Sequence, residues 1–190
     1  MKYADYINPE IWTGGFYELS IEYHPSGDHK KLNDALDSLY QCDFFNGMWV
    51  EKSDYQTSPV PLPINIEEES VHLFYGTITL TASNQLPCVI SIIRVHGESD
   101  WLDISIPQAI LEEKFPYRYP LTKELNPWLS KVVELYAKLV ETIFESSPFT
   151  IAIIGEEISG ADIPEINLEH VTIITHSQLE TKLGINRKND

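Results

Sequence analysis

Basic residues are scarce in this sequence. The chain contains 13 Lys and Arg against 29 Asp and Glu, which gives a formal net charge of −16 at pH 7. A nucleic acid is bound through clustered Lys and Arg that neutralise its phosphates, and an anionic membrane surface attracts the same clusters. We therefore expect neither a nucleic acid nor a membrane among the partners of this protein.

Cysteine is rarer still, and long hydrophobic runs are missing. Cys42 and Cys88 are the only cysteines, and both have apolar neighbours, which is typical of buried thiols in a reducing compartment. No run of about 18 apolar residues occurs, the length that predicts a membrane-spanning helix, and the first residues contain no apolar signal core. We therefore expect a cytoplasmic protein.

The familiar catalytic and metal-binding motifs are also absent. The sequence has no zinc-ligand spacing, no Gly-x-Ser-x-Gly motif around a nucleophile and no glycine-rich phosphate loop followed by Lys. We therefore assign no catalytic residue, no metal ligand and no cofactor from the sequence.

Apolar and aromatic residues are plentiful by contrast. Hydrophobic residues make up 43% of the chain, which includes 4 Trp, 10 Tyr and 7 Phe, a composition typical of a folded globular protein. The length predicts a single domain over residues 1–190. Within it we expect a surface loop or lid at 51–69, where prolines and glutamates concentrate, and a frayed tail at 186–190.

The spacing of apolar residues predicts both helices and strands. Two main helices are expected at 28–41 and at 127–145, with Asn126 as the cap of the second. Alternation and β-branched runs predict strands at 16–23, 71–81, 88–96, 101–106, 151–154 and 171–175, with Asn46-Gly47 as a turn between two shorter stretches. We predict the α+β class: a single mixed, mainly antiparallel sheet of about six strands with the two main helices packed on one face.

Two acidic groups are candidate binding sites. Glu67, Glu68 and Glu69 follow one another in the 51–69 loop, and Glu156, Glu157 and Asp162 follow the buried strand at 151–154. Carboxylates after such a strand can bind a hard cation or act as an acid and a base. The simpler interpretation is a solvated turn, because adjacent residues of an extended chain point to opposite sides.

Two further clusters have weaker support. His24, Asp28 and His29 are the best candidates for a metal site, but ordinary histidines hydrogen-bonded at the surface are the favoured interpretation. Asp103 shares one face of its strand with Trp101 and Ser105, so this stripe is a recognition surface unless a helix covers it. We expect a helix to cover it.

The charge favours a binding function over an enzymatic one. Surplus negative charge steers a cationic partner toward the protein and speeds its association. We predict an acidic protein-binding domain for a basic partner, and the concrete form of this hypothesis is an inhibitor or immunity-type protein that covers the basic site of a nuclease or toxin. The partner is expected to contact Glu67, Glu68, Glu69, Glu156, Glu157 and Asp162.

Two other classes remain open. One is a metal-assisted hydrolase with a divalent cation held by Glu156, Asp162 and a histidine. The other is a structural subunit of a homo-oligomer, in which exposed aromatic residues seal the interface. The aromatic residues in question are Trp12, Trp49 and Trp101.

Overall fold

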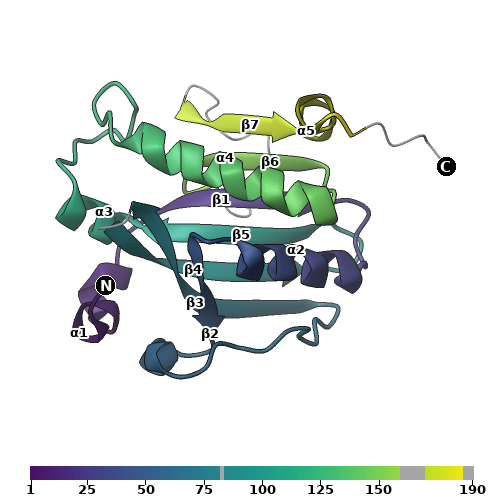
Figure 1. The fold of residues 1–190 in the computed structure, drawn as a ribbon, viewed down its shortest axis with the longest axis horizontal. Coiled ribbons are helices and arrows are strands. Elements are labelled where there is room, and N and C mark those ends of the chain that lie inside the picture. Colours follow the sequence, from purple (N-terminus) through teal and green to yellow (C-terminus); the bar gives the residue numbers. More distant parts are fainter. Residues whose placement is uncertain (82–83, 159–169, 186–190) are drawn as a thin grey trace.

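A computed structural model describes the chain apart from residues 82–83, 159–169 and 186–190. Seven strands form one sheet in the order β2-β3-β4-β5-β1-β6-β7, and every neighbouring pair is antiparallel (Figure 1). The predicted α+β class is confirmed, with one strand more than expected and no parallel pair among the described strands. The tail predicted at 186–190 lies outside the described residues.

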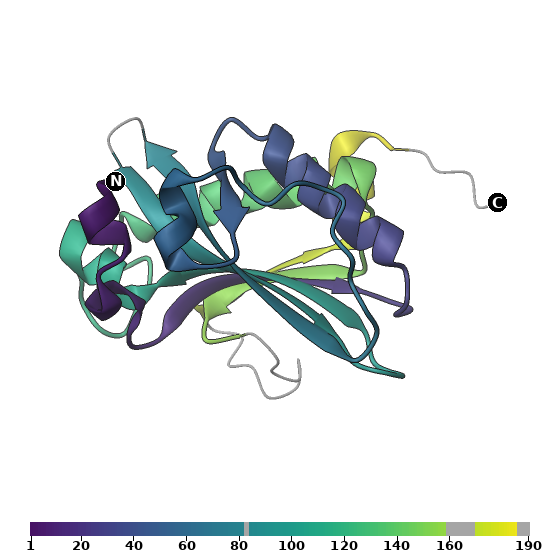
Figure 2. The ribbon, with the colours of Figure 1, turned by 90° about the horizontal axis from the view of Figure 1, so that it is seen from below.

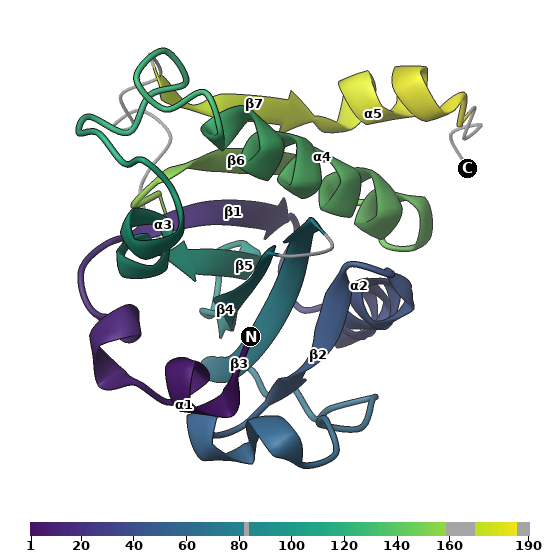
Figure 3. The same cartoon turned by 60° about the vertical axis from the view of Figure 1, so that its left-hand side comes forward.

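The two main helices and the six predicted strands occur in the expected order along the chain. The strands are β1 (Phe16–Tyr23), β2 (Phe45–Trp49), β3 (Ser70–Thr81), β4 (Asn84–Arg94), β5 (Asp100–Pro107), β6 (Ile151–Glu156) and β7 (Thr172–Thr175). The helices are α1 (Tyr3–Tyr6), α2 (His29–Gln41), α3 (Gln108–Lys114), α4 (Leu129–Ser146) and α5 (His176–Leu183), with 3-10 helices η1 (Pro9–Trp12) and η2 (Lys52–Gln56). In Figure 3, α1 and η2 lie together beside β2 and β3.

Helices α2 and α4 pack on one face of the sheet, which we call the inner face (Figure 2). The alternation along each strand sends every second side chain to this face, and the apolar stripes of the two helices cover it. The buried residues include Leu19 and Ile21 of β1, Ile90 and Ile92 of β4, Leu102 and Ile104 of β5, and Val132, Tyr136 and Ile143 of α4. The prediction of two main helices on one face is confirmed.

The edge strand β2 differs from the prediction of a turn at Asn46-Gly47. The strand runs through this dipeptide and contains an irregularity in its pairing between Phe45 and Met48. Gly47 adopts a φ of 101°, which a residue without a Cβ tolerates. A bulge therefore replaces the turn. At the free edge of β2, the Val60 N–H donates a hydrogen bond of 2.9 Å to the Met48 carbonyl.

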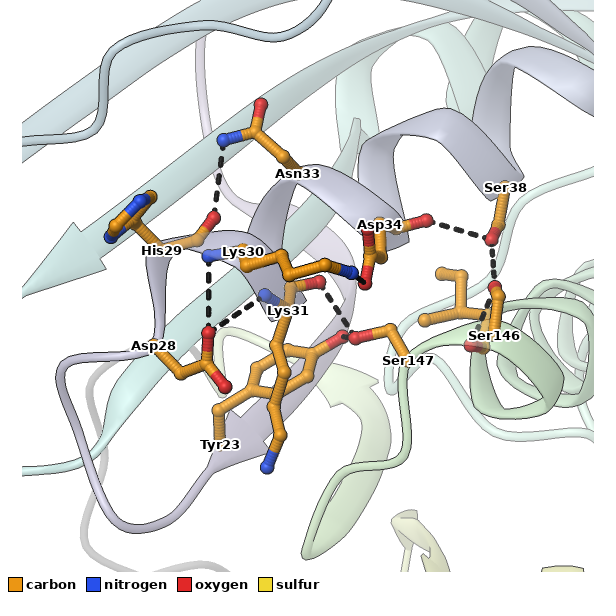
Figure 4. A network of polar contacts seen from close by, with 11 residues as sticks. Tyr23, Asp28, His29, Lys30, Lys31, Asn33, Asp34, Ser38, Ser146 and Ser147 are labelled. Carbon is orange, nitrogen blue, oxygen red and sulfur yellow. Dashed lines mark hydrogen bonds and ion pairs between the residues drawn. The ribbon is translucent and has the colours of Figure 1, made fainter.

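Polar contacts tie the start of α2 to neighbouring elements (Figure 4). Asp28 caps the helix, because its carboxylate accepts hydrogen bonds from the backbone N–H groups of Lys30 and Lys31. Ser147, just after α4, donates to the Lys31 carbonyl over 2.7 Å and lies 3.3 Å from the Tyr23 hydroxyl. These contacts fix α2, α4 and β1 relative to one another.

The second main helix begins later than predicted. α4 starts at Leu129 with Trp128 as its N-cap, and no side chain caps it. The Asn126 side chain instead holds the preceding loop, because it accepts from the Arg118 N–H and donates to the carbonyls of Arg118 and Pro120. The expected capping role of Asn126 is therefore wrong: its hydrogen-bonding groups are used by the loop.

Candidate functional site

The face of the sheet opposite α2 and α4, which we call the outer face, carries three rows of side chains. Cross-strand pairing across β3, β4, β5 and β1 defines each row. In every row the residue on β3 is apolar or aromatic and the residue on β1 is polar. The rows are Tyr75, Val89, Ser105 and Glu18; Leu73, Ser91, Asp103 and Ser20; and Val71, Ile93, Trp101 and Glu22.

The β3 end of the outer face is apolar and open to solvent. Val71 is 61% exposed and Leu73 is 51% exposed, and they are the second and fourth residues of β3. Neighbouring apolar side chains exposed in this way mark interaction surfaces more often than isolated ones do. Among the described residues, the inner face has no such exposed apolar pair, because helices α2 and α4 cover it.

The β1 end of the outer face contains two buried carboxylates. Glu18 is 5% exposed and Asp103 is 1% exposed. The Ser20 hydroxyl donates to Asp103 Oδ1 over 2.5 Å, and the Ser105 hydroxyl donates to Glu18 Oε1 over 3.0 Å. The backbone N–H of Ile158 also donates to Glu18 Oε2 over 2.7 Å. Hydrogen bonds of this kind offset the cost of burying a carboxylate.

An aromatic pair closes one end of the same surface. Trp12 from η1 and Tyr75 from β3 meet edge to face, with ring centroids 5.2 Å apart. Trp12 is held in place by a hydrogen bond of 2.7 Å from its indole N–H to the Tyr6 carbonyl. Together with Lys52, the open apolar residues and the two carboxylates, the pair lines a cavity of about 360 Å³, which we call the outer-face pocket.

The acidic triplet Glu67–Glu69 lies immediately before β3. Glu69 has a φ of 54°, and with Glu68 it lines a separate cavity of about 250 Å³. The basic residue of this cavity, Arg94, already forms a buried ion pair with Asp100, with 3.3 Å between Nε and Oδ1. Because Arg94 also donates to the Ile66 carbonyl over 2.8 Å, it anchors the loop that carries the triplet.

The second acidic group lies at the opposite end of the sheet. Glu156, the last residue of β6, accepts a hydrogen bond of 2.7 Å from the Gln108 amide, and Glu157 is exposed with a φ of 48°. Asp162 lies outside the described residues. The structure therefore does not bring the two predicted groups together, and the outer-face pocket lies between the sheet corners that they occupy.

The other predicted clusters are also placed by the structure. Within the described residues, no three His, Cys, Asp or Glu side chains are arranged to hold a metal ion. The Asp28 carboxylate, proposed to join His24 and His29, caps α2 instead (Figure 4). Both cysteines are free and buried, and burial raises the pKa of the Cys88 thiol, which disfavours its reactive thiolate form.

The stripe of Trp101, Asp103 and Ser105 lies on the outer face, opposite α2 and α4. Helices α2 and α4 do not cover it, because the core residues on the other side of β5 draw both helices to the inner face, although Asp103 and Ser105 are themselves buried. The exposed aromatic set also needs correction: Trp49 is buried, and its indole donates to the Thr57 carbonyl over 3.2 Å. The sequence did not predict that Glu18 is buried, because a glutamate in an alternating strand usually indicates a solvent-exposed face.

No helix in the described part of the chain is both long enough and apolar enough to cross a membrane. Comparisons with protein-family models, curated proteins and solved structures found no match to this chain.

Proposed function

We propose that this protein is an acidic protein-binding domain whose basic protein partner docks on the outer face of the sheet. The outer-face pocket is the observation that carries the proposal, because it combines open apolar residues with buried carboxylates. The specific form that we propose is an inhibitor or immunity-type protein that covers the basic site of a nuclease or toxin. The two buried free thiols favour a reducing compartment, so the proposal places it in the cytoplasm.

The shape of the surface supports a protein partner. Val71 and Leu73 offer an apolar contact, and interfaces gain most of their affinity from apolar and aromatic residues at the centre of the contact. Trp12 and Tyr75 are residue types that dominate such centres. The polar β1 end of the same rows supplies the charge that selects a basic partner over a neutral one.

The acidic groups at the sheet corners act on the rate of association. None of Glu67, Glu68, Glu69, Glu156 and Glu157 belongs to an ion pair between described residues. With a net charge of −16, the protein attracts a cationic partner over a distance, and salt screens this attraction. In the proposal these residues, with Asp162, speed association, and the outer face provides the contact.

The test compares wild type with Leu73→Lys, which adds a long cationic side chain at the open apolar end. Both proteins are immobilised and incubated with lysate of the source cells at low and high salt. Basic proteins retained at low salt are identified, purified and titrated against both forms. We expect Leu73→Lys to raise the dissociation constant at least about tenfold, as loss of a central contact does.

Val50→Lys is the matched control. Val50 is 55% exposed, and it does not line the outer-face pocket, so the same change of charge is made elsewhere. We expect this variant to bind as wild type does. Recovery of no basic protein at low salt contradicts the proposal, and so does equal binding by wild type and Leu73→Lys.

A further inference from the structure

A third cavity lies at the end of the sheet where β1 ends and β6 begins. Its volume is about 410 Å³, and it shares no lining residue with the outer-face pocket. The two cavities described above are each lined by at least two carboxylates, whereas no Asp or Glu of the described chain lines this one. We call it the Lys31 pocket, and its lining consists of His24, Lys31, Pro148, Phe149, Thr150 and His176.

Thr150 fixes the geometry of the Lys31 pocket. Its N–H donates to the Glu22 carbonyl over 2.9 Å, and its carbonyl accepts from the His176 N–H over 3.2 Å. Its hydroxyl oxygen accepts from the His24 N–H over 3.2 Å, which leaves the hydroxyl proton to be donated to a ligand. These contacts join the end of β1, the start of β6 and the start of α5 around one cavity.

The Lys31 ammonium is the cation that this pocket offers to a ligand. The neighbouring Lys30 forms an ion pair with Asp34, with 2.5 Å between Nζ and Oδ2, whereas Lys31 belongs to no ion pair between described residues. Figure 4 shows the two side chains pointing in different directions, with the Lys30 ammonium at Asp34 and the Lys31 ammonium away from it. A lysine without a carboxylate partner at the wall of a cavity is suited to bind an anion.

The two histidines of the pocket contribute differently. The Nδ1 atom of His24 lies 3.4 Å from the Ser99 hydroxyl, and Nε2 has no hydrogen bond to a described residue. His176 is engaged at both ring nitrogens, because Nδ1 lies 2.7 Å from the Phe149 carbonyl and Nε2 lies 3.3 Å from a carboxylate oxygen of Glu180. His24 can therefore donate to a ligand, whereas His176 serves as a wall.

We propose that the Lys31 pocket binds the phosphoryl group of a phosphate monoester. The Lys31 ammonium, the His24 ring and the Thr150 hydroxyl supply three separate donors, and a phosphoryl group presents three acceptor oxygens. The volume of about 410 Å³ falls within the range of about 300–1,000 Å³ found for ligand sites, so the pocket has room for the organic part of the ester beside Pro148. This inference is independent of the proposed function.

The surplus carboxylates of the protein oppose anion binding only weakly at this place. Two of them are linked to the histidines of the pocket, and both already have partners. Glu180 is paired with His176, and Glu22 accepts from the Ser99 hydroxyl over 2.6 Å. Carboxylates farther away are screened, because the Debye length is about 8 Å at physiological ionic strength. Lys31 therefore sets the sign of the charge at the pocket wall.

The test titrates phenyl phosphate, benzoate, phenol and inorganic phosphate separately into the full chain at pH 7 and constant ionic strength. Nuclear magnetic resonance follows the ring C–H signals of the histidines up to millimolar ligand concentration. With phenyl phosphate we expect saturable shifts of His24 and His176 and none of His72, which lies on β3 outside the pocket. Benzoate, with two oxygens for three donors, should bind at least about fivefold more weakly, and phenol should not bind. Inorganic phosphate, which lacks the organic part, should bind at least about threefold more weakly.

Two neighbouring residues of α2 supply the variant and its matched control. Lys31→Met keeps the apolar stem and removes the ammonium, so we expect it to weaken the binding of phenyl phosphate at least about tenfold. Lys30→Met makes the same change of net charge on the same helix, but Lys30 does not line the pocket. We expect this control to bind within about twofold of wild type. Thermal unfolding of both variants confirms that they are folded.

Each arm of the experiment can overturn one part of the inference. Absence of saturable shifts with phenyl phosphate, or equal weakening by Lys31→Met and Lys30→Met, overturns the site itself. Benzoate that binds as tightly as phenyl phosphate overturns the assignment to a phosphoryl group. Inorganic phosphate that binds as tightly as phenyl phosphate overturns the assignment to a monoester, and the ligand is then the free anion.

Discussion

The two faces of the sheet both bury charge, and they do so in different ways. On the inner face Asp100 is paired with Arg94 from the neighbouring strand, and its second oxygen accepts from the Gly27 N–H over 2.8 Å. On the outer face Glu18 and Asp103 carry the same sign of charge and lie on adjacent strands. The inner carboxylate is compensated by an ion pair, whereas the outer carboxylates accept hydrogen bonds from hydroxyl and backbone N–H groups. The following predictions test that division.

Arg94→Met is expected to have the largest effect on stability. It leaves the Asp100 carboxylate buried without its opposite charge, which costs about 3–5 kcal/mol. The free energy of unfolding from urea titration measures this cost. The double variant Arg94→Met with Asp100→Asn should recover part of the loss, and a double variant as unstable as the single one contradicts the assignment to the ion pair.

Neighbouring residues of β5 allow a direct comparison of the two faces. Ile104→Ala creates a cavity on the inner face and should cost about 2–5 kcal/mol of unfolding free energy. Ser105→Ala removes one hydroxyl from the outer face and should cost about 1 kcal/mol. Chemical denaturation of the two variants measures both values. Equal losses would show that the outer face contributes as much to folding as the inner face does.

Alkaline pH should destabilise the inner face. Burial raises the pKa of Tyr136 well above the ordinary value of 10.0, and its hydroxyl lies 2.9 Å from the carbonyls of Tyr17 and Ile104. Its contribution to stability is complete below pH 10, the unfolded value, and is lost as the pH rises toward the folded pKa. Unfolding free energies measured on both sides of this pH should fall more steeply for wild type than for Tyr136→Phe. Equal slopes would show that ionisation of Tyr136 does not cause the loss of stability at alkaline pH.

Leu73→Lys should have the smallest effect on stability. Leu73 is half exposed, so the substitution should change the free energy of unfolding by less than about 0.5 kcal/mol. Thermal unfolding of this variant beside wild type measures the change. A loss of several kcal/mol would mean that Leu73 belongs to the core, and the variant would then no longer test binding alone.

The parts of the fold that the sequence predicts well are those set by local periodicity. The apolar stripe of α4 and the alternation in β1 specify a helix and a strand without any knowledge of their partners. The start of α4 is different, because Asn126 suits a cap equally well and tertiary contacts with residues 118–120 decide its role.

The candidate site depends on pairings that are remote in sequence. Period two correctly places Asp103 on the same face as Ser105 and opposite to Asp100. The meeting of Asp103 with Glu18 requires β1 to pair with β5, and nothing local in either strand specifies that pairing. Trp12 and Lys52 reach the pocket from segments outside the sheet, so the sequence gives no sign of their meeting.

The hydrogen bond from Val60 to the free edge of β2 has a consequence for solubility. The loop that supplies the Val60 N–H carries Pro59, Pro61 and Pro63, and proline offers no N–H with which a foreign strand can pair. A border of this kind discourages two molecules from joining their sheets into a continuous ribbon. The protein can then keep Val71 and Leu73 open to water with less risk of aggregating along β2.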